Sequence, residues 1–441
     1  MHTFDELRDK HSKFVYKNYN CIKKNNVYEI SFDFEIEGLA SFNPHLVVPY
    51  NRDVDEKILE QIVFNIGMIE SISYYKIACP KVVEIQCGTL SKSQQDWWKK
   101  LYYNGLGEFR YINNIDVTID ELFSFDVKEG DDTPLHDTSS YNGYLVPVGG
   151  GKDSVVSLAT LEGEDVTTFH INTSKAIEDV IEVFNNHESD IFVKRTLDKR
   201  MLELNAEGYL NGHTPFSAMA AFVSFLTAFL NGQKYIALSN ETSANESTVK
   251  DSEVNHQYSK SLEFEQDFFD YIRTVTDSDI HYFSLLRPLN ELQIAKIFSK
   301  QNKYHPYFRS CNVGSKKDMW CGNCPKCLFV YIIMRPFLSE EELNKVFGTN
   351  LLNKESLDKD FRELVGIDEN KPFECVGTRE EVNAALIKCI KDGNDSMLIE
   401  RYKDQILASG YNIDDLLASW EEDNLVPTEE MLSKVKKMLE G

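Results

Sequence analysis

Apolar and polar residues alternate at nearly every position from Val27 to Ile36. A period of two is typical of a β-strand that buries one face. Downstream, the pattern predicts three more elements: a helix over residues 56–68, a strand over residues 81–86 and a helix over residues 94–103. Strands and helices mixed in this way predict an α+β domain.

The rhythm changes at Tyr144, where strand-like apolar runs begin to alternate with helical patterns. The runs predict four strands, over residues 144–148, 166–171, 191–195 and 235–238. An apolar helix predicted over residues 216–230 ends at Asn231-Gly232, a pair typical of a helix C-terminal cap. Such alternation predicts an α/β fold with a parallel sheet covered by helices on both faces.

These patterns divide the chain into three predicted domains. The N-terminal α+β domain spans residues 1–140 and ends in a polar linker over residues 128–141. An α/β nucleotide-binding domain follows over residues 141–340, and a helical, acidic C-terminal region occupies residues 341–441.

A glycine-rich loop directly follows the strand predicted at Tyr144. Its residues are Gly149, Gly150, Gly151, Lys152, Asp153 and Ser154. Glycines that open into a helix leave backbone N–H groups and the positive end of the helix dipole for an anion such as pyrophosphate. Asp153 fits such a site if Mg²⁺ accompanies the phosphates, because Mg²⁺ prefers carboxylates. The spacing is not that of a Walker A loop. A plain glycine turn before a helix is the alternative.

Polar residues also follow two other predicted strands. Asn172 comes after the strand at 166–171, and Asn240 and Glu241 come after the strand at 235–238. Ligands of parallel α/β sheets bind at the carboxyl ends of strands, so these residues are predicted to bind the nucleotide. A solvated polar loop is the alternative for residues 240–247.

Four of the nine cysteines form a cluster with C-x9-C-x2-C-x2-C spacing: Cys311, Cys321, Cys324 and Cys327. This spacing predicts a tetrahedral Zn²⁺ site. A [4Fe–4S] cluster uses similar spacing, and four buried free cysteines are a further alternative. We expect the metal to stabilise the loop and to take no part in chemistry.

Three further side chains are candidates for catalysis or charge compensation. His256 and Lys260 lie within five residues of each other, and His titrates near neutral pH. Arg287 precedes a predicted helix start, where it could bind a carboxylate or phosphate. Structural roles, such as a surface arginine, are the alternatives.

The net charge of −24 over 441 residues argues against a nucleic-acid partner. The N-terminus carries early acids and no apolar signal region, and the longest apolar run is too short to span a bilayer. A clustered set of cysteines suits a metal site in a reducing compartment. The composition therefore predicts a cytoplasmic enzyme without a membrane partner.

The glycine loop resembles the S-G-G-x-D-S signature of the PP-loop ATP pyrophosphatases, with Gly149 in place of the usual Ser. Together with Arg287-Pro288-Leu289 and the four cysteines, it resembles the 7-cyano-7-deazaguanine synthase branch of that superfamily. The longer pattern is closer to the ATP-dependent UDP-N-acetylmuramoyl-L-alanyl-L-glutamate epimerases of peptidoglycan synthesis. It is carried by residues 97–98, 105–109, 148–154, 239–246, 255–261, 286–294, 310–330 and 371–378.

The resemblance implies a PP-loop, HUP-like fold and an isomerase. Members of this family convert the terminal L-glutamate of the UDP-MurNAc-dipeptide to D-glutamate and consume ATP, with Mg²⁺, to AMP and pyrophosphate. Adenylation of the glutamate carboxylate would remove its charge and acidify the adjacent Cα–H.

On this view, the glycine loop holds the pyrophosphate and Asp153 binds Mg²⁺, while Lys152 and Arg287 offset negative charge. The base candidates are His256, Lys260 and Cys375, and Cys375 could equally be a core residue.

Three other functions compete with this hypothesis. A nitrile-forming synthase would use the same adenylation but explains neither the N-terminal domain nor residues 373–378. A tRNA thiolase is disfavoured by the acidic charge. A binding module with a degenerate nucleotide site is disfavoured by the intact Asp153-Ser154 pair.

Overall fold

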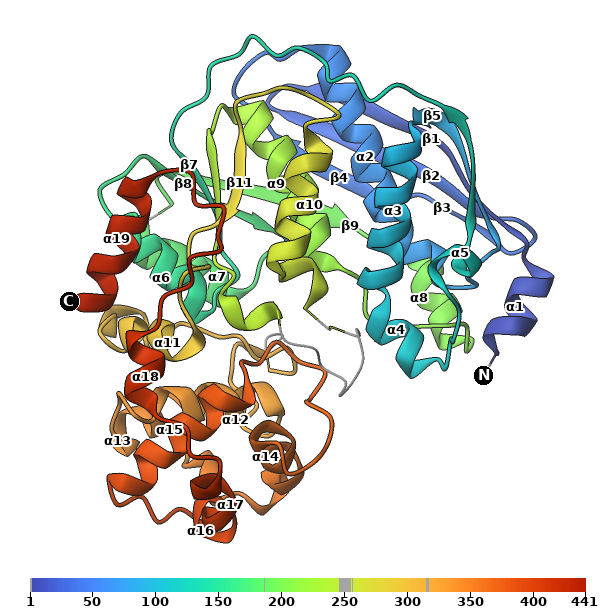
Figure 1. Cartoon of the computed structure of the whole chain (residues 1–441). Coiled ribbons are helices and arrows are strands. Elements are labelled where there is room, and N and C mark those ends of the chain that lie inside the picture. Colours follow the sequence, from blue (N-terminus) through green and yellow to red (C-terminus); the bar gives the residue numbers. More distant parts are fainter. Residues whose placement is uncertain (1, 186, 246–254, 256, 315–316) are drawn as a thin grey trace. The chain divides into compact units, whose positions relative to one another are not determined.

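The computed structural model describes residues 2–185, 187–245, 255, 257–314 and 317–441 (Figure 1). The chain forms two compact units, and neither is continuous in sequence. The first unit contains residues 1–145, 191–236 and 258–282. The second unit contains residues 146–190, 237–257 and 283–441. The three consecutive domains expected from the sequence stay a prediction.

The first unit is built on a mixed β-sheet. Its strands are β1 (Lys13–Lys24), β2 (Val27–Ile36), β3 (Ala40–Phe42), β4 (His45–Pro49), β5 (Val82–Leu90), β6 (Ser124–Glu129) and β9 (Asp190–Thr196). The order is β9-β4-β2-β1-β5-β6, with β3 beside β2. β2 pairs antiparallel with β1 and β4, whereas β5 pairs parallel with β1 and β6. Buried positions alternate along β2, and both predicted ends of this strand are confirmed.

Helices of the first unit bury most of its apolar residues. They are α1 (Phe4–Lys10), α2 (Glu56–Tyr75), α3 (Lys92–Gly105), α4 (Gly107–Ile112), α5 (Ile119–Leu122), α8 (Lys199–Ala206), α9 (Phe216–Asn231), η2 (Tyr258–Lys260) and α10 (Leu262–Ile272). α2 and α9 pack against each other, and the predicted cap at Gly232 is confirmed by its φ of 86°.

One predicted strand also pairs with a strand from the N-terminal segment. Residues 191–195, expected as a third parallel strand, lie in β9, and β9 pairs antiparallel with β4. The expected parallel pairing stays a prediction, and the β4 partner is distant in sequence. His45 to Val47 of β4 bond to β9, and the apolar pattern of a strand does not encode its direction.

In the second unit the strand order is β11-β10-β7-β8. The strands are β7 (Tyr144–Pro147), β8 (Val166–Ile171), β10 (Tyr235–Leu238) and β11 (His281–Ser284), and β7, β10 and β11 begin in the first unit. β10 pairs parallel with β7, as expected for α/β alternation. The Val148 N–H donates to the Phe169 carbonyl at 2.8 Å, just before the glycine loop.

Helices complete the second unit. In chain order, they begin with α6 (Lys152–Thr160), α7 (Lys175–Asn185), η1 (Thr242–Asn245), α11 (Glu291–Ser299), η3 (Asn302–Tyr304) and α12 (Pro325–Met334). The helices that follow are α13 (Glu340–Phe347), η5 (Leu351–Asn353), η6 (Glu355–Leu357), α14 (Asp358–Val365), α15 (Arg379–Lys391), α16 (Met397–Arg401), α17 (Lys403–Ala408), α18 (Ile413–Ala418) and α19 (Glu429–Glu440). The expected helical C-terminal region is confirmed, and α12 packs against α11, α14 and α15 (Figure 1). Among the described helices, none combines the length and apolar character needed to cross a membrane.

Candidate active site and metal centre

The glycine loop joins β7 to α6 in a conformation that requires glycine at one position. Gly150 has a φ of 76°, and an added Cβ would lie 3.0 Å from the Ile177 nitrogen. The Arg309 N–H donates to the Gly150 carbonyl at 2.7 Å and fixes the turn. Gly151 is the N-cap of α6, and no side chain in the described part of the chain caps this helix. The N–H groups at the start of α6 are therefore not taken up by a side-chain cap from the described residues, which is what the predicted anion site requires.

A buried ion pair lies directly behind this loop. The Lys152 ammonium contacts the carboxylates of Asp153 and Glu291, and the Lys152 and Glu291 side chains are only 2% and 3% exposed. Burial disfavours the charged lysine, but Asp153, Glu291 and Glu241 outweigh it and hold the Lys152 pKa above its usual range. The lysine is therefore an ammonium ion throughout the neutral range.

Glu291, the first residue of α11, contributes a buried acid to this cluster. Burial raises its pKa to about 7, and the negative charges of Asp153 and Glu241 act in the same direction against the attraction of Lys152 and Lys326. The protonation state of Glu291 consequently changes close to neutral pH. Strongly shifted groups of this kind are enriched at catalytic sites.

The Glu381 carboxylate joins three segments of the second unit. It accepts hydrogen bonds from the Ser243 hydroxyl at 2.6 Å and from the Glu291 N–H at 2.8 Å. At its other oxygen it accepts from the Thr378 N–H at 2.5 Å and the Thr378 hydroxyl at 2.9 Å. These bonds fix the backbone at the start of α11 and hence the place of Glu291.

Arg287 is fully buried, so the surface-arginine alternative is wrong. Its guanidinium donates to the Glu241 carbonyl at 2.6 Å and to the Ser284 hydroxyl at 3.4 Å. The Asn240 amide also donates to the Ser284 hydroxyl, at 3.0 Å. Arg287 thus holds the strand-end segment that carries two predicted nucleotide-binding residues, Asn240 and Glu241.

At the end of β8, His170 holds the segment that carries Asn172 by hydrogen bonds. Asn172 is exposed and has a φ of 55°. Its carbonyl accepts a hydrogen bond from His170 Nδ1 at 3.0 Å, and Asp190 accepts one from His170 Nε2 at 3.1 Å. Both partners can only accept, so both ring nitrogens donate. Burial opposes this charged form, but Asp190 and the Asn172 carbonyl outweigh it and raise the His170 pKa.

The His170–Asp190 pair makes stability dependent on pH. Because the folded-state pKa of His170 is raised, its stabilisation is complete below the unfolded value and is lost as pH rises through the folded value. We expect His170→Gln to lower the free energy of unfolding by about 1 kcal/mol more at about pH 5.5 than at about pH 8.5. Denaturant titrations at both pH values measure this difference.

His305→Gln is the matched control for that titration. The His305 ring contacts the Phe298 carbonyl rather than a carboxylate. If His170→Gln lowers the free energy of unfolding equally at the two pH values, the result would contradict a charged His170–Asp190 pair.

Residues 371–378 bring one base candidate into the second unit's site. The half-buried Cys375 has its carbonyl in contact with the Lys326 ammonium, and the Gln257 amide donates to the Val376 carbonyl at 3.3 Å. A Cβ on Gly377 would lie 3.1 Å from Glu291 Cγ, so this segment packs directly on Glu291. Of the other base candidates, His256 lies outside the described residues, and Lys260 belongs to η2 of the first unit.

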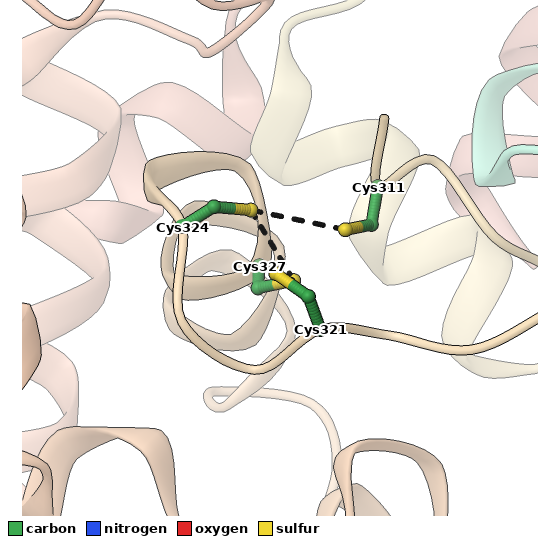
Figure 2. A group of neighbouring side chains, drawn as sticks. All are labelled: Cys311, Cys321, Cys324 and Cys327. Carbon is green, nitrogen blue, oxygen red and sulfur yellow. Dashed lines mark hydrogen bonds between the residues drawn. The ribbon is translucent and has the colours of Figure 1, made fainter. Parts of the chain in front are cut away.

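The four clustered cysteines converge, as Figure 2 shows. Their sulfur atoms all lie within 4.8 Å of one another. The distances between sulfur atoms are 3.8 Å for Cys311–Cys324, 3.6 Å for Cys321–Cys327 and 3.5 Å for Cys324–Cys327. Tetrahedral thiolates around one Zn²⁺ ion lie about 3.8 Å apart, given Zn–S bonds of about 2.3 Å. An iron–sulfur cluster would spread the sulfurs further, since each thiolate binds a different iron.

Local backbone geometry also suits a metal at this knuckle, which we define as residues 311–314 and 317–327. The N–H groups of Gly314 and Asn323 point at the sulfurs of Cys311 and Cys321, at 3.2 and 3.4 Å. Gly322 has a φ of 60°, which the turn between two ligands requires. N–H donors of this kind stabilise thiolates, and a metal ligand must be a thiolate.

Comparisons with known proteins agree with this arrangement. A family model described as the MurL N-terminal domain matches residues 5–285, and one described as the MurL C-terminal domain matches residues 307–413. The chain belongs to the MurL family. The MurL matches include the glycine loop in the first region and the four cysteines, Cys375 and Glu381 in the second.

Three relatives named UDP-N-acetyl-alpha-D-muramoyl-L-alanyl-L-glutamate epimerase are similar to this MurL chain. The relative from Xanthomonas oryzae pv. oryzae is 34% identical over 74% of this chain and 74% of its own length. The relative from Salinispora tropica is 35% identical over 77% of this chain and 76% of its own length. The relative from Micromonospora sp. is 34% identical over 81% of this chain and 83% of its own length. No solved structure matches the chain.

Sequence reasoning missed three residues of this site: Glu291, Glu381 and Lys326. Two of them carried a readable signal. Thr378-x-x-Glu381 has the spacing of a helix capping box, and Glu291 directly follows the Asn290 N-cap of α11. Neither signal says that the carboxylates meet, because their partners lie far away in the sequence.

The cysteine geometry predicts about one zinc ion per chain, as in closed four-thiolate sites. We expect Cys324→Ser to lose this zinc and to lower Tm by roughly 10 °C, the effect of a few kcal/mol in a domain of this size. Elemental analysis and calorimetry measure both quantities. Cys21→Ser is the control, because Cys21 lies outside the cluster. Iron with a visible absorption band, or protein without metal, would contradict the zinc assignment.

Proposed function

We propose that this chain inverts the terminal L-glutamate of UDP-N-acetylmuramoyl-L-alanyl-L-glutamate to D-glutamate, at the expense of ATP, in peptidoglycan synthesis. The observation that carries the proposal is membership of the MurL family, together with the shared name of the three relatives. The second unit supports it, because an anion-binding helix start and a buried set of acids occur together there.

ATP would bind at the glycine loop. The N–H groups at the start of α6 would hold its phosphates, with Gly150 providing the turn and Asp153 ligating Mg²⁺. Asn172, Asn240 and Glu241 complete the proposed nucleotide site at the strand ends. If Asp153 ligates Mg²⁺, Glu291 would remain the carboxylate partner of Lys152 and would keep the buried ammonium neutralised.

The chemistry requires the carboxylate next to Cα to be activated. One oxygen of the glutamate α-carboxylate attacks the α-phosphorus of ATP, and pyrophosphate leaves. The resulting acyl-adenylate has no carboxylate charge, so the electron pair of the Cα–H bond can delocalise into the carbonyl when a base takes the proton. A proton returns on the opposite face, and water then hydrolyses the adenylate to D-glutamate and AMP.

Cys375 is the base candidate that the second unit supports best. Its segment packs on Glu291, which in turn contacts Lys152 of the nucleotide loop, so a short chain of contacts links the thiol's segment to the ATP site. His256 and Lys260 stay candidates on sequence grounds. Zn²⁺ at the four cysteines would supply folding energy to the knuckle and no reacting group.

The direct test incubates purified protein with ATP, Mg²⁺ and the UDP-MurNAc-dipeptide and resolves the glutamate enantiomers of the product. We expect Asp153→Asn to lower pyrophosphate release at least about 100-fold, since it removes the metal-binding carboxylate while keeping its shape. Circular dichroism and Tm check the fold. Unchanged turnover in this variant would contradict the ATP site.

Glu291 predicts the pH dependence of the ATP-dependent step. Only its carboxylate form can hold the Lys152 ammonium, so pyrophosphate release should rise with pH through about 7 and then level off. We expect Glu291→Gln to release pyrophosphate at least about tenfold more slowly and to lose the rise in rate with pH. Glu291→Asp should recover part of the rate and part of its pH dependence. A Glu291→Gln variant with the native rate and pH profile would exclude this role.

A further inference from the structure

The metal knuckle and the Cys375 segment are joined by two side chains that flank metal ligands. Lys326 lies between Cys324 and Cys327, in the first turn of α12. It is buried, and its ammonium contacts the carbonyl oxygen of Cys375. If Cys324 and Cys327 bind one ion, the backbone of Lys326 between them is held at both ends, and its buried ammonium contacts the Cys375 carbonyl from there.

The second side chain, that of Asn312, contacts Glu374, the residue before Cys375. Asn312 directly follows Cys311, and its amide donates to the Glu374 carboxylate at 3.2 Å. Two of the four cysteines, Cys311 and Cys327, therefore have a sequence neighbour that contacts Glu374 or Cys375. On its other side, the segment meets Glu291 through Gly377 and Gln257 through Val376. Cys375 thus lies between the knuckle and the buried acid cluster.

The need to solvate its ammonium does not explain why Lys326 lies buried against the Cys375 carbonyl. Burying an ammonium ion costs free energy that an exposed surface position would avoid. Another lysine, Lys354, also donates to a backbone carbonyl at the knuckle, that of Gly322 at 2.8 Å. Lys354 joins the knuckle to the region between η5 and η6 and not to the Cys375 segment. The two lysines make the same kind of bond with different consequences.

We propose that the four-cysteine knuckle positions Cys375 through Lys326, so that the bound metal sets the geometry of the inversion step as well as the stability of the fold. Lys326 is a positioning residue in this account, because it acts through the Cys375 backbone. The role of Cys375 as base rests on the proposed function. The contact between the knuckle and the Cys375 segment is independent of the proposed function.

The test compares Lys326→Met with Lys354→Met in the full-length chain. The first readout is the rate at which iodoacetamide alkylates Cys375, followed by peptide mass mapping, with zinc content measured alongside. We expect Lys326→Met to keep its zinc and to alkylate at Cys375 at least about fivefold faster, because burial and fixed geometry limit thiol reactivity. Lys354→Met should alkylate at the native rate. Chelating the zinc from the native protein should reproduce the faster rate.

The second readout separates inversion from adenylation. Lys326→Met should lower deuterium incorporation from D₂O at the glutamate α-carbon by about 100-fold, the cost of misplacing a reacting group by about 1 Å. Dipeptide-dependent AMP release, measured at about pH 9 so that Glu291 stays ionised without the Lys326 charge, should change by less than about threefold, since the glycine loop is untouched. Lys326→Arg, which keeps the charge and the donors, should recover part of the exchange.

Alkylation at the native rate in Lys326→Met, or the same acceleration in both methionine variants, would overturn the positioning role. If Lys326→Met does not fold, Lys326→Gln and the chelated native protein give the same comparison. A native protein that lacks epimerase activity but shows the faster labelling would refute the proposed function and leave the link intact.

Discussion

The burial of the Lys152 ammonium between Asp153 and Glu291 constrains the rest of the second unit. Taking these charges out of water is costly, and removing one partner from a buried pair typically costs about 3–5 kcal/mol. The surrounding structure must therefore hold both carboxylates in place. Glu381 does so for Glu291 by accepting its backbone N–H, and α6 does so for Asp153 by its position in the first helical turn.

This constraint explains why the acids come from distant parts of the chain. Glu291 starts α11, Glu381 lies in α15, and Ser243 belongs to η1 after β10. One hydrogen-bonded carboxylate joins all three. The C-terminal helical region thereby contributes to a site whose glycine loop lies more than two hundred residues earlier. The metal knuckle joins the same assembly through Lys326.

Local features were predictable from the sequence, and contacts between distant segments were not. The strand at Val27–Ile36, the cap at Gly232 and the converging cysteines follow from periodicity, backbone freedom and ligand spacing, which act over a few residues. The antiparallel pairing of β9 depends on β4, and the role of Glu291 depends on Lys152. Such pairings are decided by tertiary packing, which one sequence does not display.

The central claim is that ATP activates the glutamate carboxylate by forming an acyl-adenylate. The most direct measurement uses the UDP-MurNAc-dipeptide labelled with ¹⁸O in the terminal α-carboxylate and follows the label by mass spectrometry of the AMP formed. The carboxylate oxygen becomes the bridging oxygen of the adenylate, and hydrolysis at the acyl carbon leaves it on phosphorus. The account predicts one ¹⁸O atom in AMP for each D-glutamate produced. Formation of D-glutamate with unlabelled AMP, or without ATP, would contradict it.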